Sequence, residues 1–215
     1  MNVKLLAYTH APDVLCGEAA AICTGSDSPI KALRGAMASG HESVIEHASF
    51  TFRIEGVSRA LLAQITRHRL ASFSVESQRY VAYEDGFDYV IPPRIAALGE
   101  QQAEIYKNQM ETISTWYRNW LSLLGKDGAE DARFVLPNAT CTNLIMTANA
   151  RELRHFFALR TCNRAQWEIR ELADKMLTAC KQVAPELFKR AGCACMQGKP
   201  CPEGKRSCGK PRKAE

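Results

Sequence analysis

The segment spanning residues 67–80 constrains the fold most, because it mixes closely spaced charges with apolar side chains. It opens with the triplet Arg67-His68-Arg69 and also contains Ser77 and Arg79. A guanidinium is a planar fork of donors that suits phosphate, and a serine hydroxyl adds a short-range donor. The interleaved and flanking apolar residues are Leu61, Leu62, Ile65, Leu70, Phe73, Val75 and Tyr80. They predict a half-buried segment whose arginines need partners. A solvated basic surface is the alternative.

Hydrophobic periodicity predicts an α+β fold with a central, mostly antiparallel sheet, long flanking helices and one domain. Phe50, Phe52 and Ile54 alternate with polar residues, which is typical of a strand with one wet face. We predict strands over residues 3–9, 48–57, 87–91 and 140–147. We predict helices over residues 28–39, 58–68, 95–124, 127–136, 150–160 and 166–189, and a helix or loop over 11–23.

Two groups of polar side chains are expected to converge around the second of these helices. Gln64, Arg67 and His68 have the spacing i, i+3 and i+4, so they are predicted to share one helix face. Ser77 and Arg79 are two residues apart, so on an extended segment their side chains point the same way. The helix and the segment after it are therefore each predicted to present donors to an anionic group.

The net charge of +5 comes from the C-terminal segment. Residues 189–215 hold eight Lys or Arg against two Glu, an excess of +6, which leaves residues 1–188 at −1. A near-neutral body is not expected of a general nucleic-acid binder. No apolar run approaches the ~18 residues of a membrane span, and the N-terminus lacks the long apolar run of a signal peptide. We therefore expect a cytoplasmic protein with neither a membrane nor a nucleic acid as partner.

The histidine and cysteine spacings argue only weakly for a metal. His41 and His47 lie six residues apart, which differs from the four-residue spacing of the helical H-E-x-x-H pair. Residues 190–215, the tail, carry Cys193, Cys195, Cys201 and Cys208. Four thiolates can bind zinc, but this spacing is not that of a zinc ribbon. We predict no metal site, and a flexible basic tail that follows one domain over residues 1–189.

A second cluster of basic residues lies on the predicted helix 150–160. Arg151 and His155 have the spacing i, i+4 and share a face, whereas Arg160 lies at the C-terminal end. A cation at that end interacts favourably with the helix dipole. Taken alone, this pattern fits a charged helix face with a capping arginine.

Several motifs together give the chain a resemblance to the flavin-dependent thymidylate synthases. Arg67-His68-Arg69, seven further residues and then Ser77 resemble the R-H-R-x₇-S signature of that family without a gap. Further matching elements are H-E-S-x-x-E-H over residues 41–47, Asn149-Ala150-Arg151, Leu159-Arg160, Gln166-Trp167-Glu168-Ile169, and Arg133 with Leu136-Pro137. The resemblance extends from His41 to Ile169. Many members have Asn-Glu where this chain has Ser74-Val75, so a flavin contact there falls to the backbone of Val75.

The resemblance implies FAD-dependent methylation of dUMP to dTMP, with NADPH as reductant and 5,10-methylenetetrahydrofolate as one-carbon donor. It implies flavin contacts at Ser43, Glu46, Arg67, His68, Arg69, Val75, Asn149, Ala150, Arg151 and His155. It implies dUMP contacts at Gln64, Arg67, Ser77, Gln78, Arg79, Arg133 and Arg160. Arg160 is the implied catalytic residue, because its positive charge favours N3-deprotonated uracil and so raises electron density at C5.

The chain lacks a Gly-rich dinucleotide fingerprint, so no Rossmann unit is expected to bind FAD. The family resembled here binds FAD between subunits of a homotetramer, which implies shared active sites. Two other hypotheses stay open. Phe73 and Tyr80 with the basic tail suggest a single-strand nucleic-acid binder, and the tail cysteines suggest a metal-binding accessory protein.

Overall fold

The computed structural model describes residues 1–125 and 127–213, so residues 214 and 215 of the predicted tail lie outside it. The fold is α+β, as predicted, with one antiparallel four-stranded sheet in the order β1-β2-β4-β3. The strands are β1 (Asn2–Tyr8), β2 (Ser49–Ser58), β3 (Ala71–Val75) and β4 (Cys141–Asn149). The predicted strands 3–9, 48–57 and 140–147 are confirmed to within about two residues. The predicted strand 87–91 is reduced to a single bridge between Tyr89 and Thr140.

The register of the sheet follows from side-chain pairs on neighbouring strands. The Thr51 and Thr147 hydroxyls lie 2.9 Å apart, and Gly56 N donates to Asn143 Oδ1 at 3.1 Å, so β2 and β4 run in opposite directions. Phe50, Phe52 and Ile54 of β2 are fully buried, as their alternation predicted. One face of this strand therefore belongs to the hydrophobic core.

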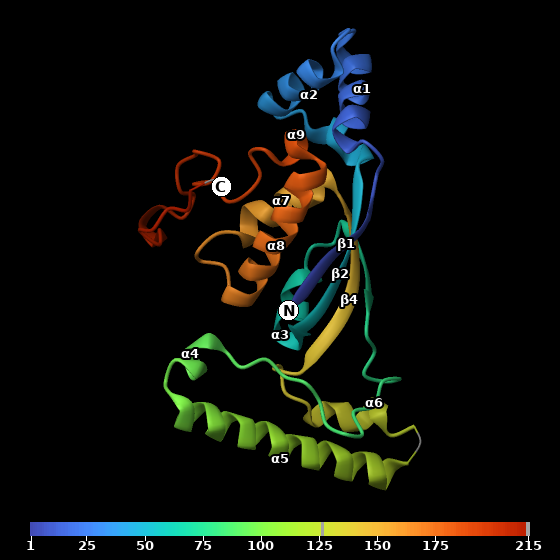
Figure 1. The fold of residues 1–215 in the computed structure, drawn as a ribbon, viewed down its shortest axis with the longest axis vertical. Coiled ribbons are helices and arrows are strands. Elements are labelled where there is room, and N and C mark those ends of the chain that lie inside the picture. The colour runs from blue at the N-terminus through green and yellow to red at the C-terminus, as the bar shows by residue number, and fades with distance from the viewer. Residues whose placement is uncertain (126, 214–215) are drawn as a thin grey trace. The chain divides into compact units, whose positions relative to one another are not determined.

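The chain forms two compact units, and all four strands contribute residues to both. Unit 1 comprises residues 1–2, 54–64 and 74–144. Its helices are α3 (Arg59–Ile65), α4 (Pro93–Ala96), α5 (Glu100–Leu124), α6 (Ala129–Ala132) and the 3₁₀ turn η2 (Arg133–Val135). Within this unit, α5 and α6 lie side by side (Figure 1).

Two helix predictions in unit 1 were wrong in their extent. The predicted helix 95–124 is broken at Gly99, whose φ of 118° is a conformation that favours glycine. The predicted helix 127–136 shrinks to α6 and η2, because the residue before Pro137 is driven out of the helical region. Helix α3 ends at Ile65 rather than 68, although Ser58 Oγ accepts from Leu61 N at 3.0 Å and caps its start, as expected of a serine.

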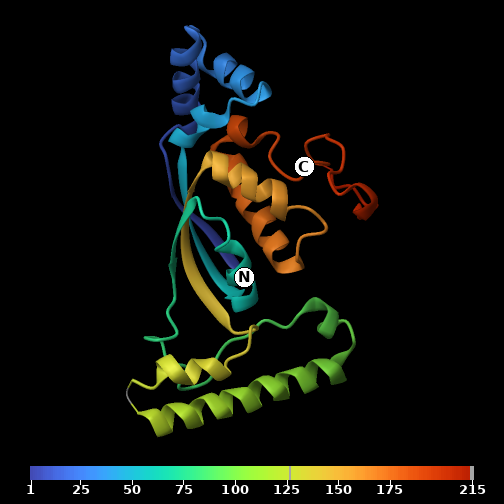
Figure 2. The same cartoon turned by 180° about the vertical axis from the view of Figure 1, so that it is seen from behind.

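Unit 2 comprises residues 3–53, 65–73 and 145–215. It holds α1 (Pro12–Thr24), α2 (Pro29–Ala38), η1 (Glu42–His47), α7 (Ala150–Arg160), α8 (Trp167–Val183), α9 (Pro185–Phe188) and η3 (Gly204–Arg206). Helices α7 and α8 pack against each other, and so do α1 and α2 (Figures 1 and 2). The predicted helix 166–189 is divided before Pro185, which has no backbone N–H to continue α8.

Aromatic rings form the core of unit 2. The Phe50 and Phe188 rings lie 5.3 Å apart, and Phe157 lies 5.8 Å from Phe188 and 5.7 Å from Phe156. All four side chains are fully buried, and edge-to-face contacts at these distances are favourable. This cluster fixes the buried face of α7, the helix that carries much of the predicted site. Among the described residues, no helix is long and apolar enough to cross a bilayer.

Candidate active site

The N-terminus of α7 is held by the first residues of the Asn149-Ala150-Arg151 motif. Asn149 Oδ1 accepts a hydrogen bond from Glu152 N at 2.9 Å, which caps the helix. Ala150 is fully buried, so a larger side chain would not fit there. Arg151 is exposed, and its Nη1 donates to Glu46 Oε1. The motif therefore starts the helix and also aims a guanidinium outward from it.

A cavity of about 780 Å³ lies along α7 within unit 2, and we refer to it as the α7 cavity. Four of the predicted flavin contacts line it: Glu46, Asn149, Arg151 and His155. The full lining is Glu42, Glu46, Leu70, Asn149, Arg151, Glu152, Arg154, His155, Ala158, Ala191, Gln197 and Lys199. Ser43 is not among these residues; it lines a separate cavity of about 790 Å³ beside α1 and α2.

A polar triad joins two buried residues, Glu152 and His68, to half-buried Arg160; we call it the buried polar triad. His68 Nδ1 lies 3.0 Å from Glu152 Oε1, and Arg160 Nε donates to His68 Nε2 at 3.2 Å. The His68 and Glu152 side chains are 4% and 6% exposed, so both groups depend on each other for hydrogen bonds. Arg160 is the last residue of α7, as predicted. Its side chain is held in place by the hydrogen bond to His68.

The direction of these hydrogen bonds defines the state of His68. Because Nε2 accepts from Arg160, the ring proton sits on Nδ1 and is donated to Glu152. Burial and then the positive charge of Arg160 lower the pKa of His68, although the hydrogen bond to Glu152 raises it. Burial, followed by repulsion from Arg67, also lowers the pKa of Arg160. A neutral imidazole thus couples a buried carboxylate to a half-buried guanidinium.

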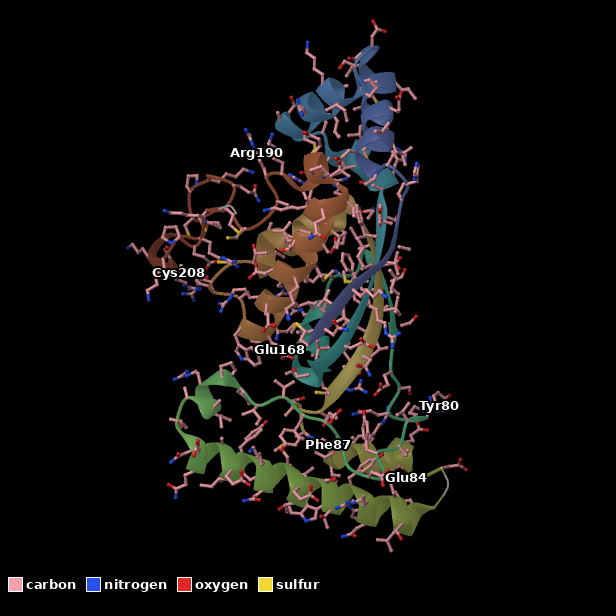
Figure 3. All side chains as sticks on the ribbon, in the orientation of Figure 1. Tyr80, Glu84, Phe87, Glu168, Arg190 and Cys208 are labelled. Atoms are coloured by element: carbon pink, nitrogen blue, oxygen red, sulfur yellow. The ribbon has the colours of Figure 1, made fainter. Side chains whose placement is uncertain are left out.

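The prediction that segment 67–80 is half buried holds for only part of it. His68 is buried, but Arg67 and Arg69 are exposed, Leu70 is 77% exposed and Tyr80 is 82% exposed. Figure 3 shows Tyr80 extending away from the ribbon. Helix α3 ends at Ile65, before this segment begins. The expectation that Gln64, Arg67 and His68 share one helix face was therefore wrong.

The predicted phosphate contacts of unit 1 lie on a turn instead of an extended segment. Ser77 O accepts from Tyr80 N at 3.2 Å and from Val81 N at 3.0 Å, and Ser77 Oγ accepts from Arg79 N at 3.3 Å. We call this the 77–81 turn. It follows Val75, the half-buried last residue of β3. The expectation that Ser77 and Arg79 point the same way because of strand geometry was wrong, since the serine hydroxyl is engaged by the turn itself.

Glu76 fixes the start of the 77–81 turn. Its carboxylate accepts from Asn143 Nδ2 at 2.7 Å and from the Tyr83 hydroxyl at 3.2 Å, and its backbone oxygen accepts from Arg59 Nη2 at 3.1 Å. Gln78 Nε2 is buried and makes no hydrogen bond within the usual distance and angle limits to the described residues, although the Gln78 side chain lies beside the Tyr83 hydroxyl. A buried donor of this kind is costly unless a ligand accepts from it.

Two predicted dUMP residues of unit 1 meet at Glu130 of α6. Arg79 Nε lies 3.0 Å from Glu130 Oε2, and Arg133 Nε donates to Glu130 O at 2.9 Å. Gln64, in contrast, donates from its side chain to Ala60 O at 3.3 Å within α3. The fold thus gathers two arginines that lie 54 positions apart in the numbering, and it places a carboxylate against one of them.

Three residues of these clusters were missed by the sequence reasoning: Glu152, Glu130 and Lys199. Glu152 falls at the third position after the helix cap, where a glutamate reads as a capping-box residue. Its contact with His68 spans 84 positions, so no local spacing could have indicated it.

Among the tail thiols, Cys193 and Cys195 have sulfurs 3.4 Å apart. In the described part of the chain, no three His, Cys, Asp or Glu residues are grouped to hold a metal ion.

Comparisons with known proteins show the family to which the chain is related. Residues 4–186 match the family model described as "Thymidylate synthase complementing protein". A flavin-dependent thymidylate synthase from Geobacter sulfurreducens is 48% identical, covering 98% of this chain and 94% of its own length. One from Clostridium tetani is 44% identical over the same shares, and one from Nitratidesulfovibrio vulgaris is 53% identical over 80% of this chain and 72% of its own.

The fold is also similar to a solved structure of flavin-dependent thymidylate synthase ThyX from Helicobacter pylori, complexed with FAD and dUMP. The TM-score is 0.70 at 23% identity, covering 89% of this chain and 100% of the other. At that identity the likeness concerns the fold alone. The family model and the curated sequence matches show an enzyme of the methyltransferase type. The chain belongs to the family of flavin-dependent thymidylate synthases.

Proposed function

We propose that this enzyme converts dUMP to dTMP, with FAD as cofactor, NADPH as reductant and 5,10-methylenetetrahydrofolate as one-carbon donor. The buried polar triad carries this proposal, because it holds Arg160 as a fixed cation at the end of α7. Family membership supports the reaction class. We further propose that the enzyme acts in the cytoplasm.

FAD fits the α7 cavity by the chemistry of its lining. Guanidinium, imidazole and amide groups are available there for a polar ring system and a diphosphate. We propose that Glu46, Asn149, Ala150, Arg151 and His155 form this part of the flavin site. The remaining proposed flavin contacts are Ser43, Arg67, His68, Arg69 and the backbone of Val75. Bound FAD supplies the redox chemistry of the reaction.

The dUMP phosphate fits the 77–81 turn. The buried Gln78 Nε2 lies there outside hydrogen-bond geometry to the described residues, and Arg79 and Arg133 each bring a guanidinium group against Glu130. Guanidinium groups bind phosphate through paired hydrogen bonds. We propose that Ser77, Gln78, Arg79 and Arg133, with Gln64 and Arg67, bind dUMP.

Arg160 is proposed to act on the uracil base. A positive charge beside the ring favours the N3-deprotonated base and raises electron density at C5, where the new carbon–carbon bond forms. Such a charge is effective when it is held in place before the reaction, because no reorganisation is then needed. The hydrogen bond to neutral His68, which is itself held by Glu152, provides this positioning.

We also propose a homotetramer with active sites shared between subunits. Several apolar and basic side chains of the predicted site face solvent, namely Arg67, Arg69, Leu70 and Tyr80. Such side chains are suited to contact a second subunit, which supports this proposal. Each site is then assembled from more than one copy of the chain.

The test is dTMP formation by the purified enzyme with all proposed substrates. Replacing Arg160 by alanine should leave FAD bound but lower the turnover number by about a hundredfold or more, the usual loss for a stabilising charge. Arg118→Ala on α5 is the matched control, because Arg118 pairs with Glu111 on the surface. Unchanged turnover in Arg160→Ala would remove Arg160 from the mechanism.

A further inference from the structure

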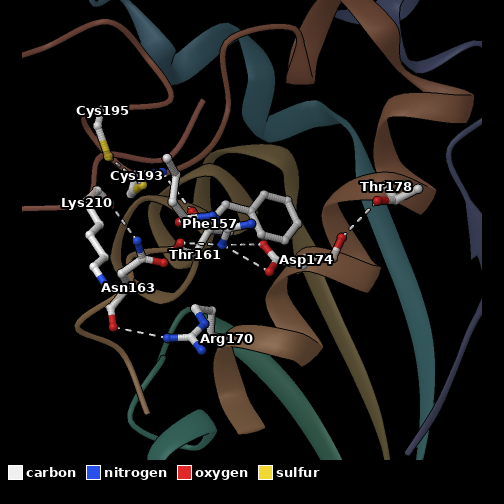
Figure 4. Close-up of polar contacts among 10 residues, drawn as sticks. Phe157, Thr161, Asn163, Arg170, Asp174, Thr178, Cys193, Cys195 and Lys210 are labelled. Atoms are coloured by element: carbon white, nitrogen blue, oxygen red, sulfur yellow. Dashed lines mark hydrogen bonds and ion pairs between the residues drawn. The ribbon is translucent and has the colours of Figure 1, made fainter. Parts of the chain in front are cut away.

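The tail packs against α7 and α8 through specific hydrogen bonds. Cys193 N donates to Thr161 Oγ1 at 2.8 Å, and Arg212 Nη1 donates to Thr161 O at 2.6 Å. Arg212 also pairs with Asp174 at 2.9 Å, and Asn163 Nδ2 donates to Lys210 O at 2.7 Å (Figure 4). These contacts hold the tail against Thr161 and Asn163, which follow Arg160, and against Asp174 of α8.

The first part of the tail is packed into unit 2. Ala191, Cys193 and Met196 are 5%, 2% and 9% exposed. Gly192 has a φ of 129°, and a Cβ there would lie 2.9 Å from the Met196 sulfur, so glycine is required for this turn. Gln197 Nε2 then donates to Gly192 O at 2.6 Å and closes the loop. This packing fixes the position of the residues that follow, from Gln197 to Lys199.

That place is the α7 cavity. Ala191, Gln197 and Lys199 of the tail line it together with Glu46, Arg151 and His155, which belong to the proposed flavin site. Lys199 N also donates to Ala194 O at 2.9 Å, which holds its backbone. The tail thus forms part of the wall of the cavity.

The other charges in this wall are matched. Arg151 pairs with Glu46, and Arg154 pairs with Glu42 at 3.3 Å and donates to the Leu187 carbonyl. Glu152 is bound to His68 and is not available to a cation. In the part of the chain that the structure describes, no carboxylate pairs with Lys199. The cavity therefore has one unmatched positive charge, at the side formed by the tail.

We propose that Lys199 is a binding residue for the diphosphate of the flavin dinucleotide. This inference rests on the proposed function, which places FAD in the same cavity. An ammonium group is a compact cation with three donors, and it suits phosphate oxygens as a point charge. The tail contacts at Thr161 and Asp174 hold the segment that carries Lys199.

The test compares FAD with riboflavin, which has the same ring system but no phosphate. Lys199→Ala in the full chain should raise the dissociation constant of FAD by about tenfold, as expected for loss of a charge-assisted hydrogen bond. The same variant should bind riboflavin as the unaltered protein does. Lys205→Ala is the matched control, because Lys205 lies in the same tail but not in the cavity wall.

Each outcome separates this inference from the proposed function. Equal FAD affinity in Lys199→Ala and the unaltered protein overturns the role of Lys199 while FAD binding stands. A parallel loss of riboflavin affinity also overturns it, because the tail then acts through packing. Failure of the unaltered protein to bind FAD overturns the proposed function, and this inference with it.

Discussion

Glu152 shows how one buried carboxylate can govern a residue that it does not touch. It accepts from His68 Nδ1, which sets the tautomer whose Nε2 accepts from Arg160. Glu168, which lies in α8, is also buried. The Gln166 side chain caps α8 by accepting hydrogen bonds from the backbone amides of Glu168 and Ile169. Gln166, Glu168 and Ile169 of the Q-W-E-I motif thus have a structural role at the start of α8.

Replacing Glu152 by glutamine should weaken both the fold and the reaction. His68 loses a charged acceptor in a buried site, which costs about 2 kcal/mol of unfolding free energy, and Arg160 loses its fixed position. Urea unfolding and the turnover number measure the two effects, with exposed Glu18→Gln of α1 as control. If Glu152→Gln turns over as fast as the control, Glu152 does not position Arg160.

Stability should depend on pH through His68. Burial and Arg160 hold its folded pKa below the unfolded value of about 6.5, so the unfolded chain binds the proton more readily. The stabilisation is complete above about pH 6.5 and is lost as the pH falls from there towards the lower folded pKa. The groups facing the ring are Glu152, Arg160 and His155.

The measurement is the urea midpoint at about pH 7.5 and about pH 5.5 for the unaltered protein and for His68→Gln. The unaltered protein should lose more stability on acidification, because glutamine does not titrate in this range. Equal losses in the two proteins would show that other groups cause the dependence.

At the scale of elements, the starts of α3 and α7 were predictable from sequence, whereas the end of α3 and the break before α5 were not. Ser58 and Asn149 cap α3 and α7 through local hydrogen bonds that spacing indicates. The 77–81 turn was mistaken for an extended segment because its bonds use the Ser77 carbonyl, which every residue type has. Arg79 and Arg133 meet at Glu130 through tertiary packing. Hydrophobic periodicity reports only local spacing and does not predict such contacts.

Glu130 of α6 should compete with the dUMP phosphate for Arg79. Both are anions, and Glu130 lies 3.0 Å from the Arg79 guanidinium. Glu130→Gln should therefore lower the dissociation constant of dUMP a few-fold, since exposed ion pairs contribute up to about 1 kcal/mol. Calorimetric titration measures this, with Glu111→Gln on α5 as control. Weaker dUMP binding would mean that Glu130 orients Arg79 for the substrate.

For the whole molecule, the α+β class and much of the sheet could be predicted from the sequence, because alternation and caps are local signals. The two compact units and the α7 cavity could not, because they bring together residues from distant parts of the chain. Unit 1 carries Ser77 and unit 2 carries Arg160.

The proposed sharing of active sites between subunits predicts complementation between inactive variants. Ser77→Ala and Arg160→Ala should each be inactive alone, but co-expressed chains should recover about a quarter of the activity if one site takes these residues from different subunits. The measurement is dTMP formation by hetero-oligomers purified through two different affinity tags. Purified hetero-oligomers without recovered activity would place both residues in one subunit.

We propose that the nucleotide substrate of this flavin-dependent enzyme binds beside the cofactor. The most direct measurement is the visible absorbance spectrum of the purified protein under anaerobic conditions, before and after NADPH, with and without dUMP. We predict an oxidised-flavin spectrum that NADPH bleaches, and that bleaches faster with dUMP present. A colourless protein that also takes up no added FAD would contradict the account.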